Sequence, residues 1–277
     1  MLKIDSHQHF WNYDEVRDSW ITDDMDVLRD DFLPQHLKSI LEHYGFDGCV
    51  VVQSDQSPAE NDFQLKHAAA HPFIKGVVGW VDLQAADIDA QLKKLSKNEK
   101  LKGFRHILQG EPDPALMLKP EFVNGISKLS AYGFTYDMLI FPHQLKYAVE
   151  LVAKFPNQRF VLNHLAKPNI KEGLIEEWKQ DIIELAKQQN VSCKVSGMVT
   201  EADWKKWKVK DFTPYLDVIF EAFGPKRVMY GSDWPVCLLA ADYGRVLSLV
   251  ENYTEKLPQE AQEDFWGNNA KRFYNLK

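Results

Sequence analysis

Cysteine is scarce in this sequence, and its pattern excludes two kinds of protein. Only three cysteines occur among 277 residues, they lie far apart, and they form no CxxC pair. An odd and dispersed set of cysteines builds neither a disulfide framework nor a cysteine-based zinc site. We therefore expect reduced thiols that serve as buried packing groups in a cytoplasmic protein.

Long apolar runs are also absent. No stretch reaches the roughly 18 consecutive apolar residues that a membrane-spanning helix requires. The opening residues, MLKIDSHQHF, do not combine a basic segment with a following apolar one, as a secretory signal would. We predict neither a membrane span nor a secretory signal.

Positive charge is in deficit. Lys plus Arg number 33 against 40 for Asp plus Glu, which gives a formal net charge of -7. General affinity for nucleic acid or for an anionic membrane needs a basic face. We therefore expect a small-molecule ligand and no nucleic-acid or membrane partner, while the sequence leaves a homo-oligomer open.

Nucleotide-binding motifs are missing as well, since no GxGxxG follows the first apolar run and no P-loop occurs. What the chain has instead is an alternation of short apolar runs with amphipathic stretches. Eight runs are rich in Val, Ile and Phe and mostly lack polar alternation, which is typical of parallel strands covered on both faces. They are Leu2–Ile4, Gly48–Val52, Ile74–Val81, Leu101–Ile107, Phe134–Ile140, Arg159–Leu162, Val191–Val195 and Arg227–Tyr230.

The stretches between these runs predict helices. After Pro34, apolar residues recur at i, i+3, i+4 and i+7, and Gly45 ends the pattern. Strands that alternate with helices in this way predict a single-domain α/β protein, a (β/α)8 TIM-type barrel over residues 1–277, with a doubly wound open sheet as the rival. Length alone would also fit two domains, but α/β barrels of about 250 residues are single domains.

The active site of such a barrel lies at the carboxyl ends of the strands, so the polar residues there are the candidates. The first run leads to His7 and His9, which share one face of a strand. The sixth run leads to His164 and the eighth to Asp233. Imidazoles in an HxH pair suit one metal ion or one substrate oxygen, and a carboxylate facing histidines suits a general base.

Other strand ends supply candidate pocket residues. Strand alternation lets only one of Arg105 and His106 face the barrel axis. We predict Arg105, because a fixed cation suits an acidic or carbonyl ligand. The remaining substrate-binding candidates are Gln53, Trp80, Asp137, Lys194 and Trp234.

Several motifs taken together resemble one enzyme family. They are DSHQHFW, GFRH, FVLNHLAKP, CKVSGMVTEADW and VMYGSDWPVC, with WGNNAKRFY near the end. This set resembles the lactonase branch of the amidohydrolase superfamily, and it covers nearly the whole chain. The resemblance implies a (β/α)8 barrel with His7, His9, His164 and Asp233 as catalytic residues. It also implies hydrolysis of an aldonolactone, such as L-fuconolactone or L-rhamnonolactone.

Two departures from that superfamily concern metal binding. Metal-dependent members usually have a His at the end of the fifth strand, and dinuclear members often have a carboxylated Lys on the fourth. Here Tyr136-Asp137 and Arg105 stand at those places. The resemblance therefore implies that no cofactor is required, with a weakly bound single zinc ion on His7, His9 and Asp233 as the alternative.

Two other functions stay open at this point. A metal-dependent decarboxylase or amide hydrolase of the same superfamily would need stoichiometric metal. A non-catalytic sugar-acid binding barrel would bind a lactone without turning it over. Against the second stands the complete set of three histidines and Asp233, because a protein without activity would tolerate the loss of members.

Overall fold

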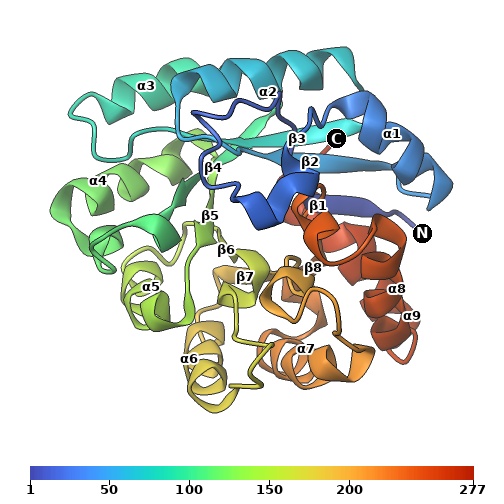
Figure 1. Ribbon diagram of the computed structural model, residues 1–277. Coiled ribbons are helices and arrows are strands. Elements are labelled where there is room, and N and C mark those ends of the chain that lie inside the picture. The colour runs from blue at the N-terminus through green and yellow to red at the C-terminus, as the bar shows by residue number, and fades with distance from the viewer.

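The computed structural model describes residues 1–277 as a barrel of eight parallel strands inside a ring of helices (Figure 1). Each strand pairs in parallel with the next one in chain order. The strands are β1 (Ile4–Gln8), β2 (Gly48–Val52), β3 (Ile74–Gly79), β4 (Leu101–Ile107), β5 (Thr135–Leu139), β6 (Phe160–Leu162), β7 (Val191–Val195) and β8 (Val228–Tyr230). This order confirms the predicted barrel and excludes a doubly wound sheet, whose strand order reverses midway.

A helix follows each strand and packs on the outside of the barrel (Figure 1). Proline stands in the first turn of α1, α2 and α4, where its missing N–H costs no hydrogen bond. The helices are α1 (Pro34–His43), α2 (Pro58–Ala70), α3 (Ile88–Leu95), α4 (Pro120–Leu129), α5 (Leu145–Ala153), α6 (Glu176–Ala186), α7 (Val209–Phe223), α8 (Tyr243–Thr254), α9 (Gln259–Glu263) and α10 (Asn269–Phe273).

The hydrophobic core has two main parts. The larger comprises 64 buried residues and fills the space between the strands and the surrounding helices. The smaller comprises 10 and joins inward-facing valines of the strands, such as Val50 and Val78, to Phe273, Tyr274 and Leu276. The C-terminal segment therefore plugs the amino-terminal end of the barrel, opposite the end at which the site lies.

Individual hydrogen bonds close the seam between β8 and β1, which is not part of the continuous strand ladder. The hydroxyl of Ser6 donates to the carbonyl of Tyr230 at 2.5 Å, and the amide of Asp233 donates to the carbonyl of His7 at 2.8 Å. The carboxylate of Asp5 accepts from the Ser232 amide at 3.0 Å. These bonds fix the residues after β8 against β1, which brings Asp233 close to His7.

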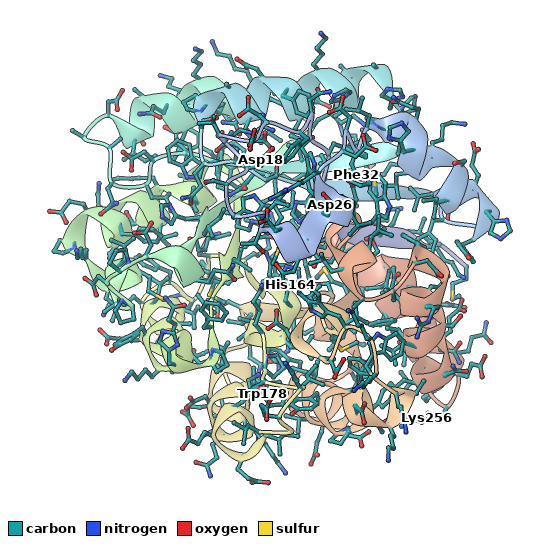
Figure 2. All side chains as sticks on the ribbon, in the orientation of Figure 1. Asp18, Asp26, Phe32, His164, Trp178 and Lys256 are labelled. Atoms are coloured by element: carbon teal, nitrogen blue, oxygen red, sulfur yellow. The ribbon has the colours of Figure 1, made fainter.

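The segment between β1 and α1 covers the carboxyl end of the barrel. It contains the short 3-10 helix η1 (Asp23–Leu28) and runs across the middle of the view in Figure 1. Trp11 and Phe32 exchange backbone hydrogen bonds at 2.9 Å, and the Phe32 ring contacts the ring of Trp234 at a centroid distance of 5.4 Å. Figure 2 labels Asp18, Asp26 and Phe32 of this covering segment, residues 10–33, above His164.

The three cysteines, Cys49, Cys193 and Cys237, are buried and unpaired, as their spacing predicted. Burial raises the pKa of each thiol, which keeps all three protonated and unreactive. In the structure, no helix has both the length and the apolar character that crossing a membrane demands.

Anchoring of the C-terminal plug can be tested at Asn269. Its buried side-chain amide donates to the carbonyls of Pro225 and Val228, both at 2.7 Å. We expect Asn269→Ala to lower the free energy of unfolding in urea by about 2 kcal/mol, because buried acceptors lose their donor. Asn252→Ala, an exposed helical position, is the matched control and should stay within about 0.5 kcal/mol. Equal decreases in the free energy of unfolding for the two variants would show that Asn269 does not anchor the C-terminal segment.

Candidate active site

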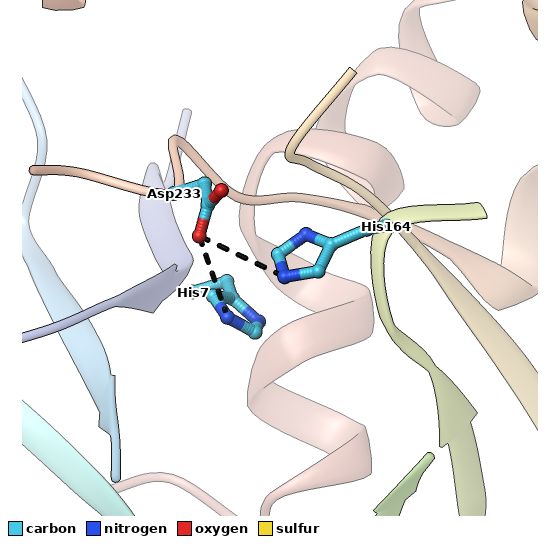
Figure 3. Close-up of side chains that lie close together, drawn as sticks. All are labelled: His7, His164 and Asp233. Carbon is cyan, nitrogen blue, oxygen red and sulfur yellow. Dashed lines mark ion pairs between the residues drawn. The ribbon is translucent and has the colours of Figure 1, made fainter. Parts of the chain in front are cut away.

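Four side chains converge at the carboxyl end of the barrel, around the carboxylate of Asp233. Its Oδ1 lies 3.4 Å from Nε2 of His9, 3.7 Å from Nε2 of His164 and 3.8 Å from Nε2 of His7. Figure 3 shows Asp233 with His7 from β1 and His164 from the segment after β6, whose rings both point toward the Asp233 carboxylate. Each of the four residues is at most 4% exposed. The residues that the sequence placed at three different strand ends thus share one enclosed space.

The backbone that carries His164 is strained. Four consecutive residues, 164–167, have φ between 52° and 58°, which makes a left-handed turn without glycine. Each such residue costs about 1–2 kcal/mol, and strain of this kind persists where the surrounding structure enforces it. Here the indole of Trp178 donates to the carbonyl of Leu165 at 2.7 Å and holds the turn. The turn brings the His164 imidazole toward Asp233.

The tautomer of His9 follows from a backbone contact. Nδ1 of His9 lies 2.8 Å from the carbonyl oxygen of Val52. A carbonyl can only accept, so Nδ1 carries the proton and Nε2 of the neutral ring carries the lone pair. Burial lowers the pKa of His9 although Asp233 opposes this effect. Nε2 of His9 is therefore a proton acceptor that faces Asp233.

His164 is held by a serine and by a glycine. Nδ1 lies 2.8 Å from Oγ of Ser196. A Cβ atom on Gly197 would come within 2.4 Å of the same ring nitrogen, so only glycine leaves room for the ring. Burial lowers the pKa of His164 to about 3, and the imidazole is neutral at neutral pH.

Asp233 is ionised despite its enclosure. Burial by itself would raise the pKa of its carboxyl group, but the electrostatic effect of the neighbouring His164 and His9 side chains outweighs it. The pKa therefore lies below its ordinary value. A carboxylate that stays charged and faces three imidazoles can take a proton from a bound water molecule.

Arg105 and Gln53 hold each other in place. The Arg105 side chain donates through Nη2 to the backbone carbonyl of Gln53 and to its Oε1, and the Gln53 amide donates back to the Arg105 carbonyl at 3.1 Å. Nη1 of Arg105 remains directed at His7, 3.3 Å from its Nε2. Burial lowers the pKa of Arg105 to about 10, which leaves the guanidinium charged at neutral pH.

Asp137 and Lys194 lie on the other side of His7 from Asp233. Both are fully buried, and Nζ of Lys194 is 2.6 Å from Oδ2 of Asp137. The same Nζ is 3.2 Å from Nδ1 of His7. In this arrangement Lys194 uses its ammonium group on Asp137 and His7, and Asp137 uses its carboxylate on Lys194 and Tyr274.

The two candidate tryptophans occupy different places. Trp80 is half-buried after β3, its backbone is held on both sides by the Asn61 amide, and its indole N–H is buried without a partner. Trp234 is only 2% exposed and packs edge-on against Phe32 of the covering segment. Trp80 thus retains a free donor, whereas Trp234 supports the cover.

One group of side chains here has the spacing of a metal site. Donor atoms of His7, His164 and Asp233 all lie within 4.8 Å of one another. Two imidazole nitrogens and one carboxylate oxygen match the donors that zinc prefers. This set differs in one member from the predicted His7, His9 and Asp233, since His164 stands in place of His9. The residues fit a single ion, and the charge of Arg105 beside His7 opposes its binding.

Two residues that shape the site had no role in the sequence interpretation, namely Gly197 and Tyr274, whereas Ser196 was expected among the polar residues at the strand ends. Ser196 and Gly197 lie in the CKVSGM segment, where a glycine directly after a strand signals close approach of another group. Tyr274 donates its hydroxyl to Asp137 across 137 positions of sequence. No local pattern could have found that contact.

The chain is similar to known amidohydrolases over nearly its whole length. The amidohydrolase family profile matches residues 4–276. An L-fucono-1,5-lactonase of Burkholderia multivorans is 38% identical over 286 residues, which covers 99% of this chain and 96% of that protein. An L-fucono-1,5-lactonase of Burkholderia ambifaria is 34% identical over 279 residues, with the same coverage of 99% and 96%. The crystal structure of an amidohydrolase from Burkholderia multivorans with bound zinc superposes with a TM-score of 0.97, 38% identity and full coverage of both chains.

The contact between Gly197 and His164 can be separated from simple backbone strain. Gly133 also has a positive φ, of 77°, but a Cβ there would meet nothing within 4 Å. We expect Gly133→Ala to lower the free energy of unfolding by about 1 kcal/mol through strain alone. Gly197→Ala should lose a further 1–3 kcal/mol or so, because the methyl group displaces the His164 ring. Equal losses in urea denaturation would show that the ring does not depend on Gly197.

Proposed function

The chain belongs to the amidohydrolase family, and we propose that it opens a sugar lactone to the corresponding sugar acid, with L-fucono-1,5-lactone as the first candidate and L-rhamnonolactone as the second. The observation that carries this proposal is an ionised, enclosed Asp233 in contact with three histidines. The full-length similarity to L-fucono-1,5-lactonases supports the choice of substrate class.

The carbonyl oxygen of the lactone binds between Arg105 and His7. Nη1 of Arg105 and Nε2 of His7 are 3.3 Å apart, so an oxygen placed beside both would meet two nitrogens. An oxygen between two donors gains most when it becomes an oxyanion, and each preorganised donor is worth on the order of 3 kcal/mol in the transition state. This pair therefore stabilises the tetrahedral intermediate.

Asp233 activates the water molecule that attacks the lactone carbonyl. Its carboxylate takes one proton from the water as the oxygen–carbon bond forms. Nε2 of His9 lies 3.4 Å from Oδ1 and presents a lone pair, so it accepts a hydrogen bond from the protonated carboxyl group. His164 closes the other side of the space. The proton then passes to the ring oxygen as the ester bond breaks, which gives a hydroxyl group and a carboxylic acid.

The hydroxyl groups of the sugar meet the polar wall of the site. The free indole N–H of Trp80 supplies one donor, and Gln53 fixes the guanidinium of Arg105 that orients the carbonyl. A lactone is an activated ester, so attack by a carboxylate-activated water suffices. A zinc ion, when bound by His7, His164 and Asp233, would supply Lewis-acid polarisation of the carbonyl group.

Substrate and metal dependence are measured together. The chelator-treated protein is screened by a pH-indicator assay against 1,4- and 1,5-aldonolactones, including L-fucono and L-rhamnono forms. We expect rapid hydrolysis of one stereochemical group, with the same rate before and after chelation. Activity that disappears with chelator and returns with zinc would assign metal-ligand roles to His7, His164 and Asp233. No hydrolysis of any lactone would refute the proposed function.

The role of Asp233 is tested by Asp233→Asn. The amide keeps the size of the side chain but cannot take a proton, so we expect kcat to fall by about 10³-fold or more. Asp26→Asn, in the exposed part of the covering segment, is the control and should keep wild-type kcat. Thermal unfolding of both variants checks that the fold persists. A wild-type kcat for Asp233→Asn would exclude it as the base.

A further inference from the structure

A charged lysine lies directly behind His7, where the proposed reaction makes no use of it. Lys194 is on β7 and has no exposed surface. Its Nζ has two polar partners, Oδ2 of Asp137 at 2.6 Å and Nδ1 of His7 at 3.2 Å. Burying such a side chain is costly unless it is paired, so its position needs an explanation.

Asp137 and Tyr274 hold the ammonium group in place. The Tyr274 hydroxyl lies 2.9 and 2.8 Å from the two carboxylate oxygens of Asp137, and the Tyr274 ring lies 5.2 Å from Nζ. Burial lowers the pKa of Lys194, and the facing carboxylate of Asp137 opposes that effect. The three groups form one hydrogen-bonded unit that presents an N–H bond to His7.

We propose that Lys194 is a positioning residue that holds His7 in the tautomer with its proton on Nε2. An ammonium group has three donors and no acceptor. Nδ1 of His7 must therefore carry the lone pair, and the ring proton sits on Nε2, on the side of Asp233. The proposed function requires His7 to donate a hydrogen bond through Nε2, and the contact of Lys194 with Nδ1 leaves the proton on that nitrogen.

Arg105 is the competing donor, since its Nη1 lies 3.3 Å from Nε2 of His7. A neutral imidazole has only one lone-pair nitrogen, and it can satisfy only one of the two cations. Lys194 is fixed by Asp137 and has no other acceptor within reach, whereas Arg105 already donates to Gln53 through Nη2. Arg105 and His7 then each offer an N–H group to the carbonyl oxygen of the lactone. The role of these two donors toward the lactone rests on the proposed function.

The same tautomer makes His7 a poor metal ligand. A histidine that binds zinc through Nε2 carries its proton on Nδ1 and usually donates it to a carboxylate or a carbonyl. In this protein Nδ1 faces an ammonium group, which cannot accept that proton. Lys194 therefore weakens zinc binding at His7, His164 and Asp233. It favours the metal-free site, in which Nε2 of His7 donates a hydrogen bond.

The wild-type protein gives the first test. With histidine labelled by ¹⁵N and metal removed, two-dimensional NMR distinguishes the two tautomers of each ring, and the His7→Gln variant assigns the His7 signals. We expect His7 with its proton on Nε2. A proton on Nδ1 would overturn the proposal, because Lys194 would then be accepting rather than donating. This result needs no variant of Lys194 to fold.

The second test removes the charges in a pair. Lys194→Met combined with Asp137→Asn leaves no unpaired buried ion, and Lys102→Met on β4, whose Nζ faces the carbonyl of Asn275, is the control. Zinc affinity is measured by competition with a chromophoric chelator. We expect affinity at least 10-fold tighter in the double variant and unchanged in the control. Unchanged affinity in a folded double variant would overturn the link between Lys194 and metal binding.

Failure of the proposal and failure of the proposed function are distinguishable. If no lactone is hydrolysed but His7 has its proton on Nε2 and zinc binds more tightly without Lys194, the positioning role stands and the substrate assignment falls. If lactones are hydrolysed and His7 has its proton on Nδ1, the reverse holds.

Discussion

A buried charge must be paired or given polar partners, and the interior of this barrel meets that requirement with two layers of polar contacts. In the lower layer, Lys194 is neutralised by Asp137, which also accepts from Tyr274. In the upper layer, Asp233 lies among three neutral imidazoles, and Arg105 is clamped by Gln53. The geometry of the upper layer depends on the lower one, since His7 connects the two through its two ring nitrogens.

The two histidines of the HxH pair have different partners at Nδ1. Nδ1 of His9 faces the carbonyl of Val52 at the end of β2, which sets the tautomer of His9. Nδ1 of His7 instead faces the ammonium group of Lys194. The two histidines of the HxH pair therefore have opposite properties although they are two residues apart. One presents a lone pair to Asp233, and the other is inferred to present a proton. A single strand end thus supplies both a proton acceptor and a hydrogen-bond donor.

Most of the fold could be predicted from apolar runs, because parallel strands covered on both faces lack polar residues. β2, β4 and β7 have the predicted bounds. The first strand was predicted too early, at Leu2–Ile4 instead of Ile4–Gln8, since its candidate site residues are polar and interrupt the apolar pattern. The convergence of the histidines with Asp233 could be predicted, because the carboxyl ends of all barrel strands lie at one end of the barrel. The partners of Lys194 could not be predicted in this way. A strand-end rule says where a residue lies but not which neighbour its charge meets.

The plug at the amino-terminal end of the barrel has a consequence for the order of assembly. Tyr274 lies C-terminal to all eight strands, and its hydroxyl completes the environment of Asp137. During synthesis, His7 leaves the ribosome well before Tyr274, the residue that braces its supporting ion pair. The polar interior of the barrel therefore cannot be completed strand by strand, because it also needs the C-terminal segment to pack against the amino-terminal end of the barrel.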